Sequence, residues 1–373
     1  MKGRWNSRVV FMVLLLALLA AIEIAREHRP SFLRPDLHLY AYVSNTADGT
    51  LSIVDVPRLA TIATIPVGPS PSGVRAHPTR KEIWGVSSQG GFVWVLDAKA
   101  SRVIAQIYVG AAPFALDFSP DGRRAYVAAS GANSVTAIDV AERKIVARGR
   151  AGRGPWIARV TPDGELVVVA NRDDATVSLL DAKTLVPVAT VPVLPQPEQI
   201  AILPDSSKAF ISSGASEELA VVNLRGGVST ANLDLGGGAA SFVLKPDGGE
   251  LYVPSPGAHG LLIMNTWTNE VSDYLLLGMS PTRGVLTADA ASLYVADSAA
   301  GRIVPIAIAT RQVGKPIPAG QNPGACALTP GDDLLLVVNG DSNDLAVIRT
   351  RTASLITLVP VGRRPRDLAV KVF

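Results

Sequence analysis

Short apolar runs recur along the chain at a fixed spacing of 42 residues, and polar turns separate them. The recurrent core is first seen as Tyr42-Val43-Ser44-Asn45, and equivalent cores begin at positions 84, 126, 168, 210, 252, 294 and 336. Short apolar runs between turn signals are typical of β-strands. A strand-rich repeat of about 40–50 residues predicts a β-propeller, in which each repeat forms one blade.

One repeat, residues 113–152, illustrates the strands that the pattern predicts. They cover residues 114–119, 125–129, 134–139 and 145–148. The first turn between them, Pro120-Asp121-Gly122, combines a proline that fixes φ with a glycine that tolerates positive φ. Four short antiparallel strands make one blade. The fold class is therefore all-β, a β-propeller of eight four-stranded blades.

The end of the chain repeats only the first strand of a blade. Pro365 lies 42 residues after Pro323, so residues 363–372 align with a first strand that has no blade after it. The first repeat, which begins near Leu39, has only an imperfect first strand in residues 32–35. We expect the C-terminal strand to pair with the N-terminal blade and to close the ring, because it would cover an open strand edge.

The first 22 residues lie outside the repeat. Three basic residues there precede an apolar run over residues 9–22. This pattern is typical of a secretory signal, and the run is shorter than the roughly 20 residues of a full membrane span. We expect residues 1–22 to be a signal peptide, or an anchor in the inner membrane, and residues 23–38 to be a linker. Residues 39–373 would form one exported propeller, periplasmic or extracellular.

Composition and charge narrow the class of partner. Hydrophobic residues make up 48% and charged residues 18%, which suits sheets buried on both faces. The net charge of +3 equals the three basic residues near the N-terminus, so the body is neutral. A neutral body lacks the basic stripe of a nucleic-acid binder. We expect no nucleic-acid partner, and a monomer that touches a membrane only through its N-terminal segment.

The repeat resembles the YVTN family of β-propeller repeats, which includes surface-layer-type propellers. Tyr42-Val43-Ser44-Asn45 is close to the family's Tyr-Val-Thr-Asn core, and the Pro-Asp-Gly turn recurs over residues 39–373. The resemblance implies a propeller that is usually seven-bladed, so seven blades are the alternative to eight. It leaves the function open, because similar propellers include surface-layer proteins, lactonases, haem d1 proteins and quinoprotein-associated binders.

A carboxylate or amide ends the third strand of most repeats. These residues are Asp55, Asp97, Asp139, Asp181, Asn223 and Asn265. Aspartate and asparagine at such positions cap the following turn by accepting backbone N–H groups. We therefore interpret the column as structural and expect the function to lie where the repeats differ.

The residues that follow the linker proline differ between repeats, and we expect them at the mouth of the central channel. The predicted ligand-binding residues are Phe114, Trp156, Glu198, Arg283, Arg366 and Asp367, with His259 on the same face. Phe114 and Trp156 on adjacent repeats would form an aromatic wall, and the two arginines would hold a carboxylate or phosphate. The alternative is that these residues only fill the channel mouth and pair with one another.

Three further charged residues, Arg75, Asp117 and Arg159, occupy one register deeper in consecutive repeats. Because buried charges need partners, we expect a structural Arg-Asp-Arg ladder, with an anion site as the alternative. The single cysteine, Cys326, is expected to be a small buried hydrophobic residue.

Catalytic groups are few. Residues 38–373 hold three histidines, and His77 replaces a serine, threonine or leucine of other repeats, so we assign it to the scaffold. The sequence contains no Cys-x-x-Cys-His, nucleophile elbow or P-loop. We expect a non-enzymatic scaffold that binds a protein, glycan or small ligand, with no cofactor and no metal.

Two alternatives remain for the function. One is a lactonase-like metal-dependent hydrolase that uses Glu198 or Asp367. The other is a periplasmic redox-associated propeller that holds a haem d1-like or quinone cofactor on its arginines, with His259.

Overall fold

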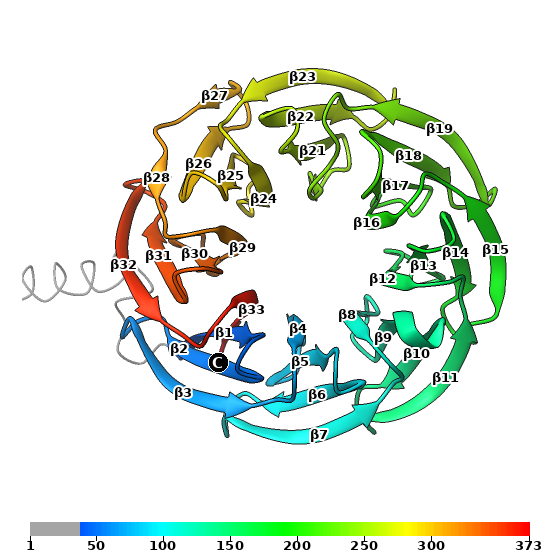
Figure 1. Cartoon of the computed structure of the whole chain (residues 1–373), viewed down its shortest axis with the longest axis horizontal. Coiled ribbons are helices and arrows are strands. Elements are labelled where there is room, and N and C mark those ends of the chain that lie inside the picture. The colour runs from blue at the N-terminus through cyan, green and yellow to red at the C-terminus, as the bar shows by residue number, and fades with distance from the viewer. Residues whose placement is uncertain (1–37) are drawn as a thin grey trace, which may run out of the picture.

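The computed structural model describes residues 38–373, which form a closed ring of eight antiparallel sheets (Figure 1). In each blade the first strand lies beside the central channel and the fourth lies at the rim. The eight sheets confirm the eight-bladed propeller that the 42-residue period predicts. The seven-bladed alternative is wrong.

The first four blades contain the following strands. Blade 1 holds β1 (Leu39–Asn45), β2 (Thr50–Asp55), β3 (Ala60–Pro66) and the last strand, β33 (Pro365–Val372). Blade 2 holds β4 (Pro71–Ala76), β5 (Glu82–Ser87), β6 (Phe92–Asp97) and β7 (Arg102–Tyr108). Blade 3 holds β8 (Pro113–Phe118), β9 (Arg124–Ala129), β10 (Ser134–Asp139) and β11 (Lys144–Arg150), with the short 3-10 turn η2 (Ser130–Ala132). Blade 4 holds β12 (Pro155–Val160), β13 (Leu166–Asn171), β14 (Thr176–Asp181) and β15 (Pro187–Pro192).

The second half of the ring continues in the same order. Blade 5 holds β16 (Pro197–Ile202), β17 (Lys208–Ser213), β18 (Glu218–Asn223) and β19 (Val228–Asp234). Blade 6 holds β20 (Val243–Leu244), β21 (Glu250–Ser255), β22 (Gly260–Asn265) and β23 (Glu270–Leu276). Blade 7 holds β24 (Pro281–Leu286), β25 (Ser292–Asp297), β26 (Arg302–Ala307), β27 (Gln312–Val313) and β28 (Ile317–Pro318). Blade 8 holds β29 (Pro323–Leu328), β30 (Leu334–Asn339), β31 (Asp344–Arg349) and β32 (Ser354–Pro360).

The C-terminal strand closes the ring as predicted. β33 pairs antiparallel with β1 from Leu39 opposite Val372 to Asn45 opposite Pro365. It takes the innermost place in a sheet whose other three strands come from the N-terminus. The last amide, that of Phe373, donates to the carbonyl of His38 at 3.0 Å. Residues 32–35, for which we expected an imperfect first strand, lie outside the described residues.

Apolar clusters between neighbouring blades form the core. Ala41 and Val43 of β1 pack against blade 8, whereas Tyr42, between them, packs with residues of blade 2. Successive side chains of a strand point to opposite faces of its sheet, and here both faces are covered. This double burial explains why the strands read as continuous apolar runs.

The column of aspartates and asparagines caps turns, as predicted. Asp97 Oδ1 accepts the N–H groups of Lys99 and Ala100, both at 2.9 Å. Asn265 Oδ1 accepts the N–H groups of Trp267 and Thr268 in the same way. These contacts leave the column with a structural role.

Two blades depart from the pattern. The first strand of blade 6 is reduced to Val243–Leu244 after a run of glycines at 236–238, two of which have positive φ. The fourth strand of blade 7 is split into β27 and β28, opposite Pro305 of β26. Proline has no N–H to donate to a neighbouring strand.

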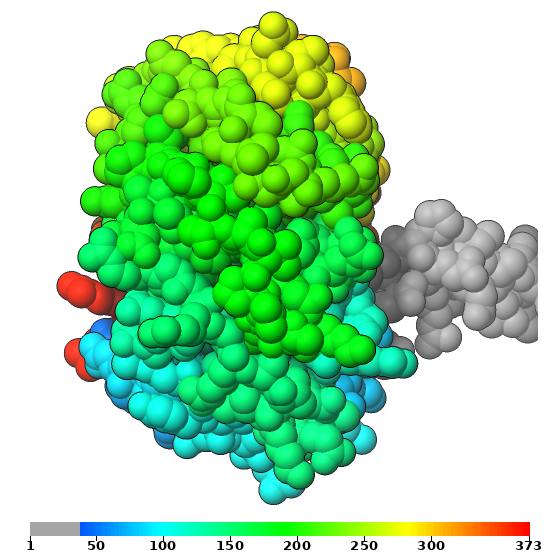
Figure 2. Space-filling view, turned by 90° about the vertical axis from the view of Figure 1, so that its right-hand side faces the viewer, coloured from blue at the N-terminus to red at the C-terminus, as the bar shows by residue number. Residues whose placement is uncertain are grey.

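The rim is formed by the outer strands, and Figure 2 looks at it from the side of β15. Val146, Val188 and Val228 are exposed on these strands, and Val186 is exposed just before β15. Scattered apolar side chains on a protein surface are normal. No helix among the described residues has the length and apolar character that a membrane crossing requires.

Candidate functional site

One face of the ring carries the connections into the first strands and the turns between the second and third strands. At this face the residue after each linker proline comes to the mouth of the central channel. Phe114, Trp156 and Glu198 follow the prolines that begin β8, β12 and β16, and Arg366 follows the proline that begins β33. The shared register of the first strands therefore brings together side chains that lie far apart in the sequence.

The aromatic pair forms the centre of the site. The rings of Phe114 and Trp156 are stacked, with centroids 4.0 Å apart and planes inclined by 21°. The guanidinium of Arg366 lies over the Phe114 ring, its Cζ 5.1 Å from the centroid, and Arg172 lies over Trp156 at 5.0 Å. The four groups therefore form one layered stack, in which a guanidinium covers the outer face of each ring. We call these four residues the mouth stack.

Small residues on blade 2 allow Arg366 of blade 1 to reach Phe114 of blade 3. Blade 2 presents only Ser72 and Gly73 at this level, and Ser72 Oγ donates to the Phe114 carbonyl at 2.8 Å. Gly73 has φ +58, and a Cβ added to it would lie 2.8 Å from Ala115 Cα. A larger residue at position 73 would therefore push β4 and β8 apart.

Glu198 is part of the same cluster but is already paired. Its Oε1 accepts from Arg172 Nη2 at 2.9 Å, and this bond orients Arg172 over the tryptophan ring. Both side chains are about one-third exposed, so solvent screens the pair. The carboxylate acts on the stack through Arg172.

Neither Arg283 nor Arg366 is paired with a carboxylate among residues 38–373. Burial lowers the pKa of Arg366, and the nearby charge of Arg283 lowers it further. Asp367 points elsewhere: it accepts from the N–H of Val74 at 3.1 Å and lies 3.3 Å from Arg75 Nη1. It thus fastens the closing strand to blade 2.

The predicted Arg-Asp-Arg ladder is wrong. Arg75 pairs with Asp367 of the closing strand, while Asp117 accepts the N–H of Val160 at 3.1 Å. Arg159 pairs with neither carboxylate, and its Nη1 is buried without a hydrogen-bond partner. The ring brings blade 1 beside blade 2, which gives Arg75 a partner that lies 292 residues away in the sequence.

His259 lies on the same face as the mouth stack but takes no part in it. It has φ +56 in the turn between β21 and β22, and its Nδ1 lies 2.9 Å from the carbonyl of Met279. Both residues are exposed, and neither contacts a residue of the stack. The structure therefore groups Phe114, Trp156, Glu198 and Arg366, and it leaves His259 apart.

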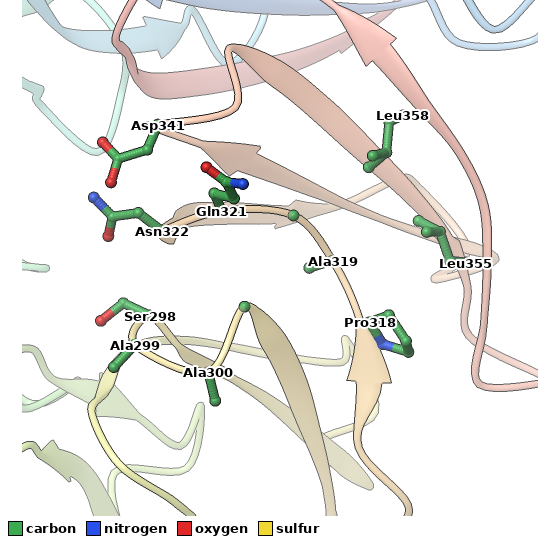
Figure 3. A pocket seen from close by; sticks show the side chains of 12 residues that line it. Ser298, Ala299, Ala300, Pro318, Ala319, Gln321, Asn322, Asp341, Leu355 and Leu358 are labelled. Atoms are coloured by element: carbon green, nitrogen blue, oxygen red, sulfur yellow. The ribbon is translucent and has the colours of Figure 1, made fainter.

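A cavity of about 750 Å³ lies between blades 7 and 8, away from the mouth stack (Figure 3). Asp341, Asn322 and Ser298 line one end, and Leu355 and Leu358 line the other. None of the predicted site residues lines it. Small residues in the turn over 298–301 leave this space between the blades.

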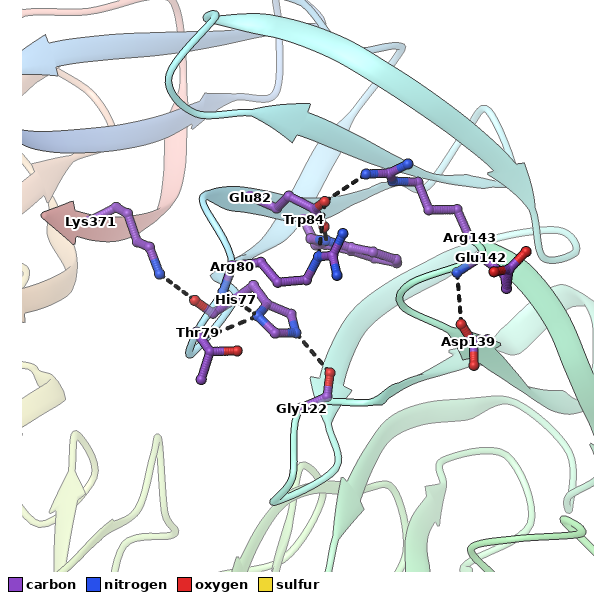
Figure 4. A network of polar contacts seen from close by, with 10 residues as sticks. All are labelled: His77, Thr79, Arg80, Glu82, Trp84, Gly122, Asp139, Glu142, Arg143 and Lys371. Atoms are coloured by element: carbon purple, nitrogen blue, oxygen red, sulfur yellow. Dashed lines mark hydrogen bonds and ion pairs between the residues drawn. The ribbon is translucent and has the colours of Figure 1, made fainter. Parts of the chain in front are cut away.

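His77 lies at the opposite face, inside a polar network (Figure 4). Its Nδ1 accepts the N–H groups of Thr79 and Arg80 at 3.2 and 2.9 Å, and its Nε2 lies 2.8 Å from the carbonyl of Gly122. This pattern assigns a neutral ring that donates through Nε2. His77 therefore links blade 2 to blade 3, as its scaffold assignment requires.

We expect His77 to make the fold sensitive to acid. Burial lowers the pKa of His77, so protonation favours the unfolded chain, whose histidine has a pKa of about 6.5. The stabilisation is present above that pH and is lost as the pH falls through the lower, folded-state pKa. Urea unfolding at pH 7 and pH 5 should show a larger loss for the wild type than for His77→Gln. Equal losses would contradict the assignment.

Other sequence-based candidates for chemistry can now be placed. Burial raises the pKa of the Cys326 thiol to about 12, so this residue behaves as a small core side chain. Within residues 38–373 no group of three His, Cys, Asp or Glu side chains is placed to hold a metal ion. Glu198 and Asp367, the carboxylates of the hydrolase alternative, are each engaged by a different arginine.

A comparison with protein families finds a match to a heme domain. A model of the cytochrome D1 heme domain matches residues 85–234, which is less than half of the chain. The matched part carries Phe114, Trp156 and Arg172 of the mouth stack. A comparison with curated proteins finds no match.

Several solved structures share the fold. Dihydro-heme d1 dehydrogenase NirN in complex with DHE is 18% identical over 88% of this chain and 74% of its own, with a TM-score of 0.70. Apo AztD from Citrobacter koseri is 12% identical over 90% of this chain and 98% of its own, with a TM-score of 0.68. Hydrazine synthase from Kuenenia stuttgartiensis is 18% identical over 75% and 95%, with a TM-score of 0.62. At these identities the likeness shows the fold alone.

The expectation that the chain has no cofactor is wrong. The family model that matches residues 85–234 is that of a heme domain, and the NirN structure holds a ligand of its own, which conflicts with this expectation. The family model that matches is not a YVTN model. The comparisons therefore support a propeller, but not the YVTN family in particular. The expectation relied on the absence of a covalent attachment motif and of paired histidines. A ligand that other side chains bind would require neither feature.

The residues of the mouth can be compared with the ring, the carboxylates and the iron of a heme. The mouth stack offers the edges of its two rings, because Arg366 and Arg172 cover their outer faces, and Arg283 and Arg366 offer charges without carboxylate partners. Heme iron is held by His, Cys, Met or Tyr side chains. The residues after the linker prolines include none of these four types. This column of described residues therefore offers aromatic rings and cations but no side chain that holds iron, whereas His259 and Met279 lie elsewhere on the same face.

Arg172 lies at the mouth although it was not among the residues predicted for it, whereas Arg159, which the sequence placed in the ladder with an anion site as the alternative, lies deeper in the channel. Arg172 lies on the turn after β13, in the same blade as Trp156, and this shared blade was the available signal. Nothing in the sequence indicated that Arg159 Nη1 lacks a hydrogen-bond partner. Pairing depends on the positions of the side-chain ends, and the repeat does not determine these.

Proposed function

We propose that this propeller binds a planar, carboxylate-bearing ligand of the tetrapyrrole class over its channel mouth. The observation that carries the proposal is the mouth stack, in which Phe114 and Trp156 lie between the guanidiniums of Arg366 and Arg172. The chain would act as a binding protein rather than an enzyme.

The chemistry of the residues supports this ligand class. The edges of the stacked Phe114 and Trp156 rings can pack edge-to-face against a flat ligand ring, with little loss of side-chain freedom. Arginine presents a fork of donors that matches a carboxylate, and Arg283 and Arg366 have no carboxylate partner within the described chain. A ligand carboxylate would thus gain charge-assisted bonds without displacing an existing ion pair.

The mouth holds the ligand by its face and its carboxylates, and iron is not required for binding. A bound heme would supply redox chemistry, but the mouth residues would only bind and orient it. This distinguishes the proposal from a redox propeller that uses His259 as an iron ligand.

We expect the full chain to bind hemin and metal-free protoporphyrin with similar affinity, because neither depends on an iron ligand. Trp156→Ala and Arg366→Gln should each weaken binding about tenfold, the loss typical of a stacking or charge-assisted contact. Quenching of tryptophan fluorescence and the visible absorption of the porphyrin both report the titration.

A matched control is available at the opposite face. Trp267 is 62% exposed in the turn between β22 and β23, so Trp267→Ala should leave the affinity unchanged. Binding of hemin but not of protoporphyrin would show that an iron ligand exists and would overturn the proposal. Wild-type affinity in Trp156→Ala would do the same.

We further propose that the protein is exported. The support is the basic and apolar pattern of residues 1–22, which lie outside the described residues. Fusion of residues 1–36 to a reporter that is active only outside the cytoplasm tests this, and an inactive fusion would contradict it.

A further inference from the structure

An unpaired cation lies in the central channel beneath the mouth stack. Arg159 belongs to β12, four residues after the linker proline, and its Nη1 is inaccessible to solvent and has no hydrogen-bond partner. A buried donor without a partner costs free energy, more so when it is charged. Such a group requires an explanation.

The charges around Arg159 come from several sides of the ring. Asp117, Arg75, Asp367 and Arg283 all act on it electrostatically, and they belong to blades 3, 2, 1 and 7. Blades 4 and 7 are not neighbours in the ring, so a charge on one can act on a charge on the other only across the channel (Figure 1). The guanidinium of Arg159 therefore belongs to the channel rather than to a gap between two blades.

These charges do not balance. The group has four guanidiniums, those of Arg75, Arg159, Arg283 and Arg366, and two carboxylates, those of Asp117 and Asp367. One carboxylate is engaged by Arg75, and the other accepts the backbone N–H of Val160. An excess of two positive charges remains. Arginine stays protonated in proteins, so it cannot reduce this excess by losing a proton.

We propose that a small oxyanion, of the size of sulfate or phosphate, binds in the channel between Arg159 and Arg283. The forked donors of two guanidiniums match the oxygens of such an anion and would satisfy the buried Nη1. The site lies deeper than the mouth stack and is separate from the planar-ligand site, although Arg283 borders both.

Calorimetric titration of the full chain with sodium sulfate, compared with sodium chloride at matched ionic strength, tests the proposal. We expect saturable sulfate binding in the wild type and a loss of at least about tenfold in affinity for Arg159→Gln, as charge-assisted bonds predict. Arg283→Gln changes an exposed residue and should also weaken binding, which keeps the test decisive if Arg159→Gln fails to fold. Arg351→Gln, exposed in the turn between β31 and β32, is the control and should bind as the wild type.

The outcomes separate this site from the mouth. Trp156→Ala should lose porphyrin affinity and keep sulfate binding, so either proposal can fail alone. Absence of saturable binding in the wild type would mean that water satisfies Arg159, and it would overturn the inference. Chloride binding as tight as sulfate binding would overturn the oxyanion assignment, and so would unchanged sulfate binding in Arg159→Gln.

Discussion

Deletion of residues 364–373 is expected to abolish cooperative folding of the ring. The deletion removes β33, whose pairing with β1 closes the propeller, and it leaves the full length of β1 as an open edge. It also removes Leu368 and Ala369, which are 6% and 7% exposed and belong to the clusters that join blade 1 to blades 8 and 2. Circular dichroism during heating should show a broad, low-temperature transition in place of a single cooperative one.

An open edge is also a template for pairing with another chain, so we expect the truncated protein to elute as oligomers in size-exclusion chromatography. Two point variants distinguish a buried side chain of β33 from an exposed one. Leu368→Ala should cost about 2–5 kcal/mol, the usual range for a buried leucine, whereas Val372→Ala, at a position 37% exposed, should cost far less. A truncated chain that melts cooperatively as a monomer would contradict the closing role of β33.

The repeat made most of this fold predictable. A period of 42 places each strand, and it also shows that Pro365 begins a strand without a blade, so the closure of the ring follows from the spacing alone. The departures arise where local chemistry overrides the period. Glycines at 236–238 leave blade 6 with a two-residue first strand, and Pro305 lies opposite the break between β27 and β28. Both changes alter hydrogen bonding without altering the spacing of apolar residues.

Only the part of the site that depends on the register of the first strands could be predicted from the sequence. Phe114 and Trp156 occupy one column on adjacent blades, so their proximity follows from the repeat. The partners of long charged side chains do not follow from it. Arg75 bonds to Asp367 and not to Asp117, and Arg172 reaches from a turn to the ring of Trp156, because reach and local space decide such contacts. A ligand held by scattered arginines and aromatic rings also leaves no spaced motif in the sequence.

Blade-to-blade ion pairs at the face opposite the mouth recur with the symmetry of the ring. Glu82 of blade 2 bonds to Arg143 of blade 3, and Glu250 of blade 6 bonds to Arg311 of blade 7, each pair 61 residues apart. Blades 2 and 6 lie on opposite sides of the eight-bladed ring (Figure 1). The equivalent position in blade 8 is apolar: Leu334 packs in the cluster that includes Leu59 of blade 1. At these three junctions the same pair of positions is therefore filled either by a Glu–Arg ion pair or by two leucines.

Replacement of Glu82 by glutamine is expected to destabilise the fold by about 2 kcal/mol at neutral pH. Glu82 is 6% exposed, and its carboxylate accepts from Arg143 at 2.6 Å, from Arg80 at 3.1 Å and from Trp84 Nε1 at 3.0 Å (Figure 4). A glutamine offers one acceptor oxygen for three donors and turns an NH₂ group towards them. Chemical unfolding in urea gives the free-energy difference.

The pH dependence of that difference separates an ionised Glu82 from a neutral polar contact. Burial alone would raise the pKa of Glu82, but the bonds from Arg143, Trp84 and Arg80 together lower it below its ordinary value. A lowered carboxylate pKa stabilises the fold above the unfolded-state pKa of about 4.3, and this stabilisation is lost as the pH falls through the folded-state value. The deficit of Glu82→Gln should therefore be full at pH 7 and should shrink steadily below pH 4.

Glu142→Gln is the matched control. Glu142 pairs with Lys144, and the two side chains are 69% and 76% exposed, so this variant should differ little from the wild type at either pH. A deficit that does not change with pH would mean that the carboxylate charge contributes nothing, and that shape alone joins these two blades.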